Sequence, residues 1–246
     1  MSGQAGSGTR AVSGTRAVSS ARARSSVREI QTPVGMARAH LWRPPHPCGA
    51  LVLGHGAGGS SWSPDLLALT SLTEHGWLVV LVEQPWRVAG RKVATPPAQL
   101  DVAWLAVMAE LTCGRGALAR PWVVGGRSAG ARVACRTAAA VQADGVLALS
   151  FPLHPPGRPD RSRAGEALLV TAAGTRLAVI QGEKDPFGSP EEVRAALGAG
   201  AEVVAARGTH AFTRTPADVL AATAAFVSSL AAGQIRGTAG GLPRRT

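Results

Sequence analysis

The segment Pro121–Val141 constrains the fold of this chain more than any other. Residues 122–124 form a short apolar run typical of a buried strand, and from Ala129 onward an Ala-rich stretch has the spacing of a buried helix. Between them, residues 126–130 (GRSAG) fit the pattern G-x-S-x-G, in which the serine, here Ser128, occupies a sharp turn that exposes its hydroxyl at the sheet edge. A glycine-rich turn with an incidental serine is the alternative interpretation.

Apolar runs alternate with helical patterns over most of the remaining chain. The expected strands cover residues 27–31, 36–42, 50–53, 77–82, 122–124, 146–149, 177–180 and 202–205. Helices are expected at 64–72, 97–111, from 129 onward, and at 164–172, 190–197 and 219–230. Strands that alternate with helices at this spacing predict a mostly parallel α/β sheet. We therefore expect one α/β domain over residues 27–231.

The two ends of the chain differ from this domain in composition. Residues 1–26 are rich in Ser, Gly, Ala and Arg, contain SGTRAV twice in tandem, and carry four arginines and no acid. Such a segment buries too little apolar surface to offset its ordering entropy, so residues 1–26 are predicted to be disordered and residues 232–246 to be a flexible basic tail. Two alternatives stay open for the first segment: a transit peptide, and a start of translation near Val27.

The net charge of +11 comes mainly from these ends, because residues 27–230 hold 19 basic residues against 15 acids. A basic excess confined to tails predicts weak, salt-sensitive binding of polyanions, so we expect no specific nucleic-acid partner.

Cysteine usage and hydropathy limit the cellular compartments in which the protein is expected. Cys48, Cys113 and Cys135 are odd in number and lack C-x-x-C spacing, which argues against a disulfide framework or a zinc site. The N-terminus has no apolar signal core, and no apolar run is long enough to span a bilayer. We expect a cytoplasmic protein with free thiols, without a metal, cofactor or membrane partner, and of open oligomeric state.

Three residues far apart in the sequence form a candidate catalytic set. A serine hydroxyl needs a base to accept its proton, usually a histidine whose other ring nitrogen is held by a carboxylate. Such groups follow the carboxyl ends of strands in α/β sheets, as Asp185 and His210 do. The order Ser128, Asp185, His210 matches the order expected for this serine turn. Glu183 is the second choice for the acid.

A second glycine-rich turn, residues 54–59 (GHGAGG), follows the expected strand 50–53. Attack on a carbonyl carbon places negative charge on its oxygen, which backbone N–H groups must stabilise. One donor is expected from Ala129 and another from Ala57, with Gly58 as second choice. The chain lacks G-x-x-x-x-G-K-[ST], and lacks G-x-G-x-x-G followed by a ribose-binding acid, which argues against a phosphate loop. A plain strand-to-helix turn stays open.

The segments HGAGG, GGRSAG, QGEKDPFG and GTHAF resemble those of the α/β-hydrolase superfamily. The segments EQPWRVAGRK, LDVAWLAV and FPLHPPG resemble its small dienelactone-hydrolase-like branch, which includes the hydrolase-like domain of a non-specific-lethal chromatin complex subunit and testis-expressed relatives. The resemblance covers roughly residues 27–230. It implies an eight-stranded, mostly parallel sheet flanked by helices, with the second strand antiparallel. It also implies Ser128 as nucleophile, Asp185 as acid, His210 as base, and Ala57 and Ala129 as oxyanion-hole donors.

Position 128 is a serine, whereas dienelactone hydrolases proper have a cysteine nucleophile, so dienelactone does not carry over as substrate. The connection between strands 146–149 and 177–180 is too short for a lid domain. The substrate-pocket candidates are Trp86, Arg127, Phe151 and His154. Arg127 is expected either to face the pocket or to pair with Glu83.

We expect a serine hydrolase that acts on small acyl esters or thioesters, with a small-molecule acyl substrate as its only predicted partner. Two alternatives stay open: a non-catalytic hydrolase-like binding or scaffold module, and an acyltransferase that uses the same three residues.

Overall fold

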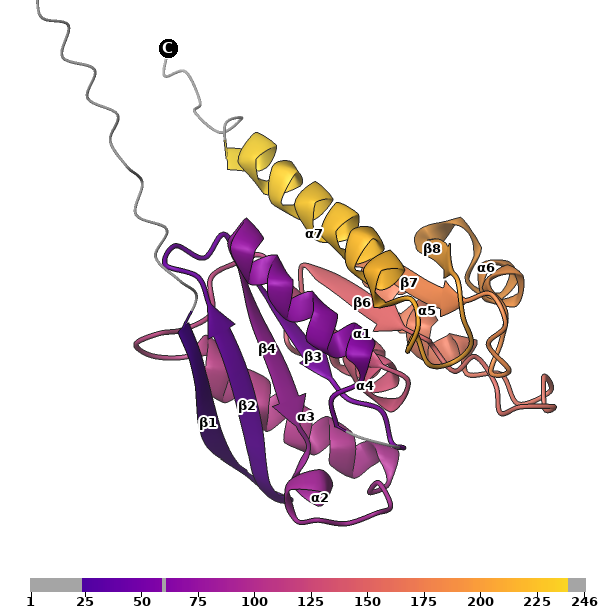
Figure 1. The fold of residues 1–246 in the computed structure, drawn as a ribbon, viewed down its shortest axis with the longest axis horizontal. Coiled ribbons are helices and arrows are strands. Elements are labelled where there is room, and N and C mark those ends of the chain that lie inside the picture. The colour runs from indigo at the N-terminus through magenta and orange to yellow at the C-terminus, as the bar shows by residue number, and fades with distance from the viewer. Residues whose placement is uncertain (1–23, 59–60, 239–246) are drawn as a thin grey trace, which may run out of the picture.

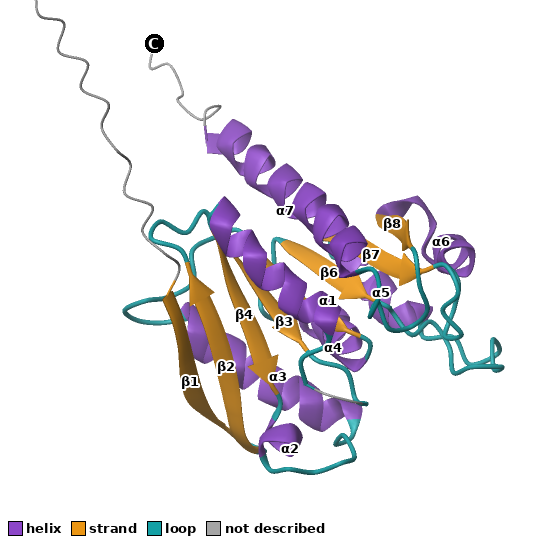
Figure 2. Cartoon of the chain, in the orientation of Figure 1, coloured by secondary structure: helices purple, strands orange, loops and turns teal. Residues whose placement is uncertain are grey.

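A single twisted sheet runs through the computed structural model, which describes residues 24–58 and 61–238 (Figures 1 and 2). Its strands are β1 Arg24–Thr32, β2 Gly35–Arg43, β3 Gly49–Gly54, β4 Trp77–Glu83, β5 Trp122–Arg127, β6 Gly145–Leu149, β7 Arg176–Gly182 and β8 Ala201–Ala206. They lie in the order β1-β2-β4-β3-β5-β6-β7-β8. The strand β2 is antiparallel to β1 and β4, and the six strands from β4 to β8 are mutually parallel, as predicted.

Helices cover both faces of the sheet (Figure 1). They are α1 Pro64–Ala68, α2 Pro85–Val88, α3 Pro97–Thr112, α4 Ala129–Thr137, α5 Ala164–Ala172, α6 Pro190–Leu197 and α7 Pro216–Thr238, with 3-10 turns η1 Leu69–His75 and η2 Gly198–Gly200. Apolar side chains of α1, η1 and α7 pack on one face, and those of α3, α4, α5 and α6 pack on the other. The connection from β6 to β7 holds only the helix α5, so the fold has no lid domain.

Burial on both faces explains the apolar composition of the central strands. All residues of β3 and β6 are buried. Because side chains alternate along a strand, Val52 packs under α3 and α4, whereas Leu51 and Leu53 pack under α1 and α7. Each such side chain contributes about 1.5–3 kcal/mol relative to an exposed one. This core fixes the carboxyl ends of the strands, where the predicted site residues lie.

The helices α1, α3 and α6 begin where the sequence predicts. Ser63 is the N-cap of α1 with Pro64 in its first turn, and α3 buries Leu100 and Trp104 on its inner face. Ser189 and Glu192 form a reciprocal capping box at the start of α6. The sequence predicts no helix between residues 82 and 97, but Pro85–Val88 forms the short helix α2 there.

Ordered structure extends past the predicted domain boundaries at both ends. The strand β1 begins at Arg24 rather than Val27, because residues 24–26 pair with residues 41–43 of β2 and such pairing does not require apolar side chains. The helix α7 continues to Thr238, past residue 231, so the predicted boundary at residue 231 falls inside a helix. The predictions of disorder for residues 1–23 and flexibility for 239–246 lie outside the described residues.

Candidate active site

The turn after β5 holds Ser128 at the N-terminus of α4. Its backbone angles, φ 52° and ψ −107°, lie where residues other than glycine are rare. A Cβ at either Gly126 or Gly130 would overlap the carbonyl oxygen of Gly54 in β3. Both glycines of the G-x-S-x-G pattern are therefore required by the close approach of β3, and the serine is held in the strained turn that the pattern predicts.

Ser128, His210 and Asp185 come together at the carboxyl edge of the sheet. Ser128 Oγ lies 2.9 Å from His210 Nε2, and His210 Nδ1 lies 2.9 Å from Asp185 Oδ2 and 3.1 Å from Oδ1. The Asp185 side chain is fully buried, whereas that of His210 is 19% exposed. When Nδ1–H donates to the carboxylate, Nε2 is left free of a proton and can accept the one on the serine hydroxyl.

The carboxylate of Asp185 is held by Gln181, a residue absent from the predicted site. The Gln181 amide nitrogen lies 3.0 Å from Asp185 Oδ2, 2.7 Å from the Gly188 oxygen and 3.2 Å from the Phe151 oxygen, and shares its two hydrogens among them. Gln181 is completely buried at the end of β7. Its signal in the sequence is a lone amide at the end of an apolar run, four residues before the predicted acid.

Phe187 contributes to the same arrangement from the loop after β7. Its N–H donates to Asp185 Oδ1 at 2.9 Å, and its ring lies against His210 with ring centroids 4.2 Å apart. The histidine ring is therefore fixed by the carboxylate at its edge and by an aromatic ring on its face. Glu183, the alternative acid, is exposed, and the contact to His210 is made by Asp185.

Arg127 lies beside the serine but pairs with Asp65 of α1 rather than with Glu83. Its Nε lies 3.6 Å from Asp65 Oδ2, and its Nη2 donates to the carbonyl oxygen of His210 at 2.6 Å. The Asp65 side chain is 1% exposed and that of Arg127 is 12% exposed. Glu83 instead accepts a hydrogen bond from Ser61 at 2.9 Å. Arg127 thus links β5, α1 and the loop after β8 that carries His210 (the histidine loop). It does not line the cavity described next.

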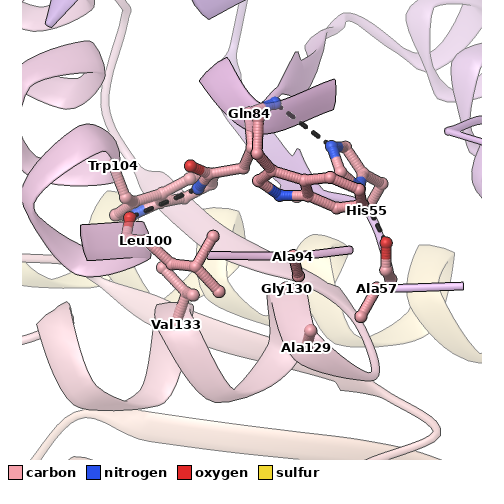
Figure 3. Close-up of a pocket in the computed structure, with 12 residues that line it drawn as sticks. His55, Ala57, Gln84, Ala94, Leu100, Trp104, Ala129, Gly130 and Val133 are labelled. Carbon is pink, nitrogen blue, oxygen red and sulfur yellow. Dashed lines mark hydrogen bonds between the residues drawn. The ribbon is translucent and has the colours of Figure 1, made fainter. Parts of the chain in front are cut away.

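A small cavity begins beside the serine turn, between the loop after β3, the first turns of α4 and the segment 84–100 (Figure 3). Ala57 and Ala129 both line it, so the two predicted oxyanion-hole residues share one space. As the first residue of α4, Ala129 has no carbonyl acceptor within its own helix. Trp86 also lines the cavity, whereas Gly58 is exposed and is not among the lining residues.

Phe151 and His154 do not line this cavity, contrary to their prediction as pocket residues. Phe151 is completely buried in the core. His154 is 7% exposed, and its backbone N–H donates to the backbone oxygen of Phe187 at 3.1 Å, while its ring Nε2 lies 3.5 Å from Glu192 Oε1. These contacts fold the loop after β6 against the loop after β7 and the start of α6, so the loop does not cover the cavity.

His55 supports the loop that carries Ala57. Its Nδ1 lies 2.8 Å from the backbone oxygen of Gly56, and its Nε2 accepts a hydrogen bond from the backbone N–H of Gln84 at 3.1 Å (Figure 3). Both contacts are satisfied by a neutral ring with its proton on Nδ1. Burial lowers the pKa of His55 below 6.5, with a smaller contribution from the nearby Arg87 charge. The neutral histidine therefore ties the loop after β3 to the end of β4.

Within residues 24–58 and 61–238, no group of three or more His, Cys, Asp or Glu side chains is placed to hold a metal ion. Among the helices of that same part of the chain, none is both long and apolar enough to cross a membrane. Cys48, Cys113 and Cys135 are all free thiols.

The strand order, the antiparallel second strand and the strained serine between strand and helix define an α/β-hydrolase fold. A comparison with protein-family models agrees: the alpha/beta hydrolase domain matches residues 47–230, and the chain belongs to this family. A comparison with curated protein sequences gives no match.

Solved structures with the same fold share little sequence with this chain. An alpha-beta serine hydrolase homologue from Coxiella burnetii is 17% identical, with a TM-score of 0.66 over 79% of this chain and 93% of that one. A serine hydrolase without a lid from Xanthomonas campestris is 21% identical, with a TM-score of 0.61 over 89% and 97%. Dienelactone hydrolase from Anabaena variabilis is 18% identical, with a TM-score of 0.65 over 85% and 97%. At these identities the similarity establishes the fold.

Proposed function

We propose that this chain is a serine hydrolase that cleaves small acyl esters or thioesters through an acyl-enzyme intermediate. The observation that carries the proposal is the continuous set of contacts from Ser128 Oγ to His210 Nε2 at 2.9 Å and from His210 Nδ1 to Asp185 Oδ2 at 2.9 Å. A serine in a strained turn with these partners meets the geometric requirement for an activated nucleophile.

In the first half of the reaction, Ser128 Oγ attacks the acyl carbon while His210 Nε2 accepts the serine proton. The carbonyl oxygen becomes negatively charged and accepts hydrogen bonds from the N–H groups of Ala57 and Ala129. The tetrahedral intermediate then expels the alcohol or thiol, which receives the proton from His210, and the acyl group remains on Ser128. Asp185 stabilises the imidazolium and keeps the ring in the required tautomer.

In the second half, a water molecule gives a proton to His210 Nε2 and attacks the acyl carbon. The bond between that carbon and Ser128 Oγ then breaks, the acid leaves, and His210 returns the proton to Ser128 Oγ. An acyltransferase would place a second alcohol, thiol or amine in the position of this water. Loss of acyl groups to water in the absence of any other acceptor distinguishes the hydrolase.

Within the α/β-hydrolase family we place the chain in the small dienelactone-hydrolase-like branch that includes the hydrolase-like domain of a non-specific-lethal complex subunit. The segments EQPWRVAGRK and FPLHPPG support this placement. We also propose the cytoplasm as its compartment, because free thiols are typical of a reducing environment. Its predicted partner is a small-molecule acyl substrate.

The test is turnover of p-nitrophenyl acetate by the parent protein and by Ser128→Ala and His210→Ala. Because the three side chains act as a unit, each substitution should lower kcat by roughly 10⁴–10⁶-fold. Labelling of the folded parent by a fluorophosphonate, which requires an activated serine, is the second readout. A folded parent that neither turns over any ester nor reacts with the probe would support the non-catalytic binding module instead.

A further inference from the structure

Two spaces of different size share Trp86 as a lining residue. The cavity beside Ala57 and Ala129 offers about 10 Å³ to the centre of a water molecule, which is room for about one water. A groove formed by the β1–β2 turn, α2 and the start of α3 offers about 230 Å³ by the same measure. Trp86 lines both spaces. The small space adjoins the predicted reaction centre, and the large one does not.

The chain around Trp86 divides between the two spaces. Ala94 and Leu100 line the cavity, whereas their sequence neighbours Thr95 and Gln99 line the groove. The segment 84–100 therefore contributes residues to the linings of both spaces. Trp86 is the residue that the two linings share, which makes its side chain the candidate partition between the cavity and the groove.

Contacts on several sides hold the ring in place. Trp86 is 3% exposed. The ring of His55 meets it edge to face with centroids 5.5 Å apart, and the guanidinium carbon of Arg87 lies 4.3 Å from its centroid. His55 is itself tied to the Gly56 oxygen and the Gln84 N–H. A ring packed in this way does not swing aside without breaking contacts in the loop that carries Ala57.

The groove could receive an apolar chain if the partition were absent. Val34, Met36 and Val88 line it together with Pro85, beside the polar Thr95 and Gln99 and the cation of Arg91. The cavity side is also mainly apolar, with Leu100, Trp104 and Val133 in its wall (Figure 3). A chain that passed the position of Trp86 would therefore remain against apolar side chains over most of its path.

We propose that Trp86 determines acyl-chain length by closing the acyl cavity off from this groove, so that the parent accepts acyl groups of two to three carbons. This proposal rests on the proposed hydrolase function and adds the substrate class. The acyl methyl group lies in the cavity beyond Ala57 and Ala129, and each further methylene meets the indole ring. Removal of the ring joins the two spaces into one channel.

The experiment measures kcat/KM for p-nitrophenyl acetate, butyrate, hexanoate and octanoate with the parent and Trp86→Leu. In the parent, kcat/KM should fall by at least about tenfold from acetate to hexanoate. The variant should gain on the order of tenfold on hexanoate relative to its own butyrate value, because each methylene that becomes buried adds roughly fourfold. Trp86→Phe, which keeps a smaller ring, should shift the optimum only to butyrate and serves as the second variant if leucine destabilises the fold.

Two further variants separate the groove from cavity size alone. Ala89 is exposed and lines only the groove, so Ala89→Phe should leave acetate turnover unchanged and, combined with Trp86→Leu, should abolish the gain on octanoate. Val133 lines only the cavity, so Val133→Ala should improve butyrate without improving octanoate.

The outcomes distinguish this proposal from the proposed function. A parent that hydrolyses octanoate as well as acetate, or a folded Trp86→Leu that hydrolyses acetate with the chain-length profile of the parent, would overturn the role of Trp86 and leave the hydrolase intact. A parent with no turnover and no fluorophosphonate labelling would overturn both.

Discussion

Replacing Arg127 with methionine would separate two parts of the site that one side chain now joins. Arg127 Nη2 donates to the His210 carbonyl oxygen at 2.6 Å, and Nε lies 3.6 Å from Asp65 Oδ2. Methionine keeps a long apolar side chain but has no charge and no donor. The buried carboxylate of Asp65 would then lose this cation, and the histidine loop would lose its link to the strand that carries Ser128.

The magnitude follows from the burial of the pair. Two unit charges 3.6 Å apart attract by about 4–5 kcal/mol at an effective dielectric constant of about 20. Desolvation of both charges offsets much of this attraction in the intact pair, but removing one partner leaves the other desolvated and costs about 3–5 kcal/mol. Because Asp65 is 1% exposed and Arg127 12% exposed, we expect Arg127→Met to lower the free energy of unfolding by about 3–5 kcal/mol.

Urea unfolding followed by tryptophan fluorescence measures the stability change, and turnover of a short acyl ester measures the effect on the site. The double variant Arg127→Met, Asp65→Asn removes the stranded charge and should recover about half of the lost stability. Its kcat should stay roughly 10–100-fold below the parent, because a displaced histidine loop misplaces the base. Asp65→Asn alone keeps the Arg127–His210 hydrogen bond and should retain kcat within a few-fold.

An Arg127→Met variant as stable as the parent would refute the assignment of a buried, coupled pair. Full kcat in the double variant would refute the positioning role of Arg127, even if the stability pattern held. The two readouts therefore test the ion pair with Asp65 and the hydrogen bond to His210 separately.

Three further predictions use buried polar groups. Gln181→Leu removes an amide donor from buried Asp185 and should cost about 1–3 kcal/mol in urea unfolding and lower kcat; unchanged values of both would contradict the assigned contact. Burial lowers the pKa of His55, so below about pH 6.5 the unfolded chain binds a proton more readily than the folded chain. The free energy of unfolding should therefore fall as the pH drops below about 6.5. The urea midpoint should therefore decline more steeply from pH 7.5 to 5 in the parent than in His55→Gln. The same pH dependence of the midpoint in both proteins would contradict this role of His55. Burial raises the pKa of the Cys135 thiol to about 12, so Ellman's reagent should titrate two thiols in the folded protein and three in urea.

The predicted catalytic residues rest on a rule of topology that needs no knowledge of side-chain packing. Parallel strands end at a common edge, so polar residues that follow two such strands must lie near each other. Asp185 and His210 follow β7 and β8, which are neighbours in the sheet, and the G-x-S-x-G turn follows β5 at the same edge. The convergence of these residues follows from where the strands end, and the distances between them in the structure agree with it.

Residues that support the catalytic set are less visible in the sequence. Gln181 sits inside an apolar strand, where a single amide is more often a buried structural group than part of a site. Its role depends on its side chain pointing toward the Asp185 carboxylate and the Gly188 oxygen. No spacing of residues in the sequence predicts that direction. The sequence does not reveal the partner of Arg127 for the same reason. Asp65 belongs to α1, and it reaches the site only because α1 packs on the sheet.

Trp86 and Phe151 show why the pocket walls could be predicted only in part. Both are aromatic residues shortly after the carboxyl end of a strand, and the sequence favours both equally as wall residues. Trp86 lies in α2, a short helix begun by Pro85, so its ring is turned against His55 and toward the cavity. Phe151 follows β6 directly and continues into the core, while Gln181 binds its carbonyl oxygen from β7. What separates the two is the path of the backbone in the first residues after each strand. That path also makes Trp86 part of the lining of both the small cavity and the larger groove.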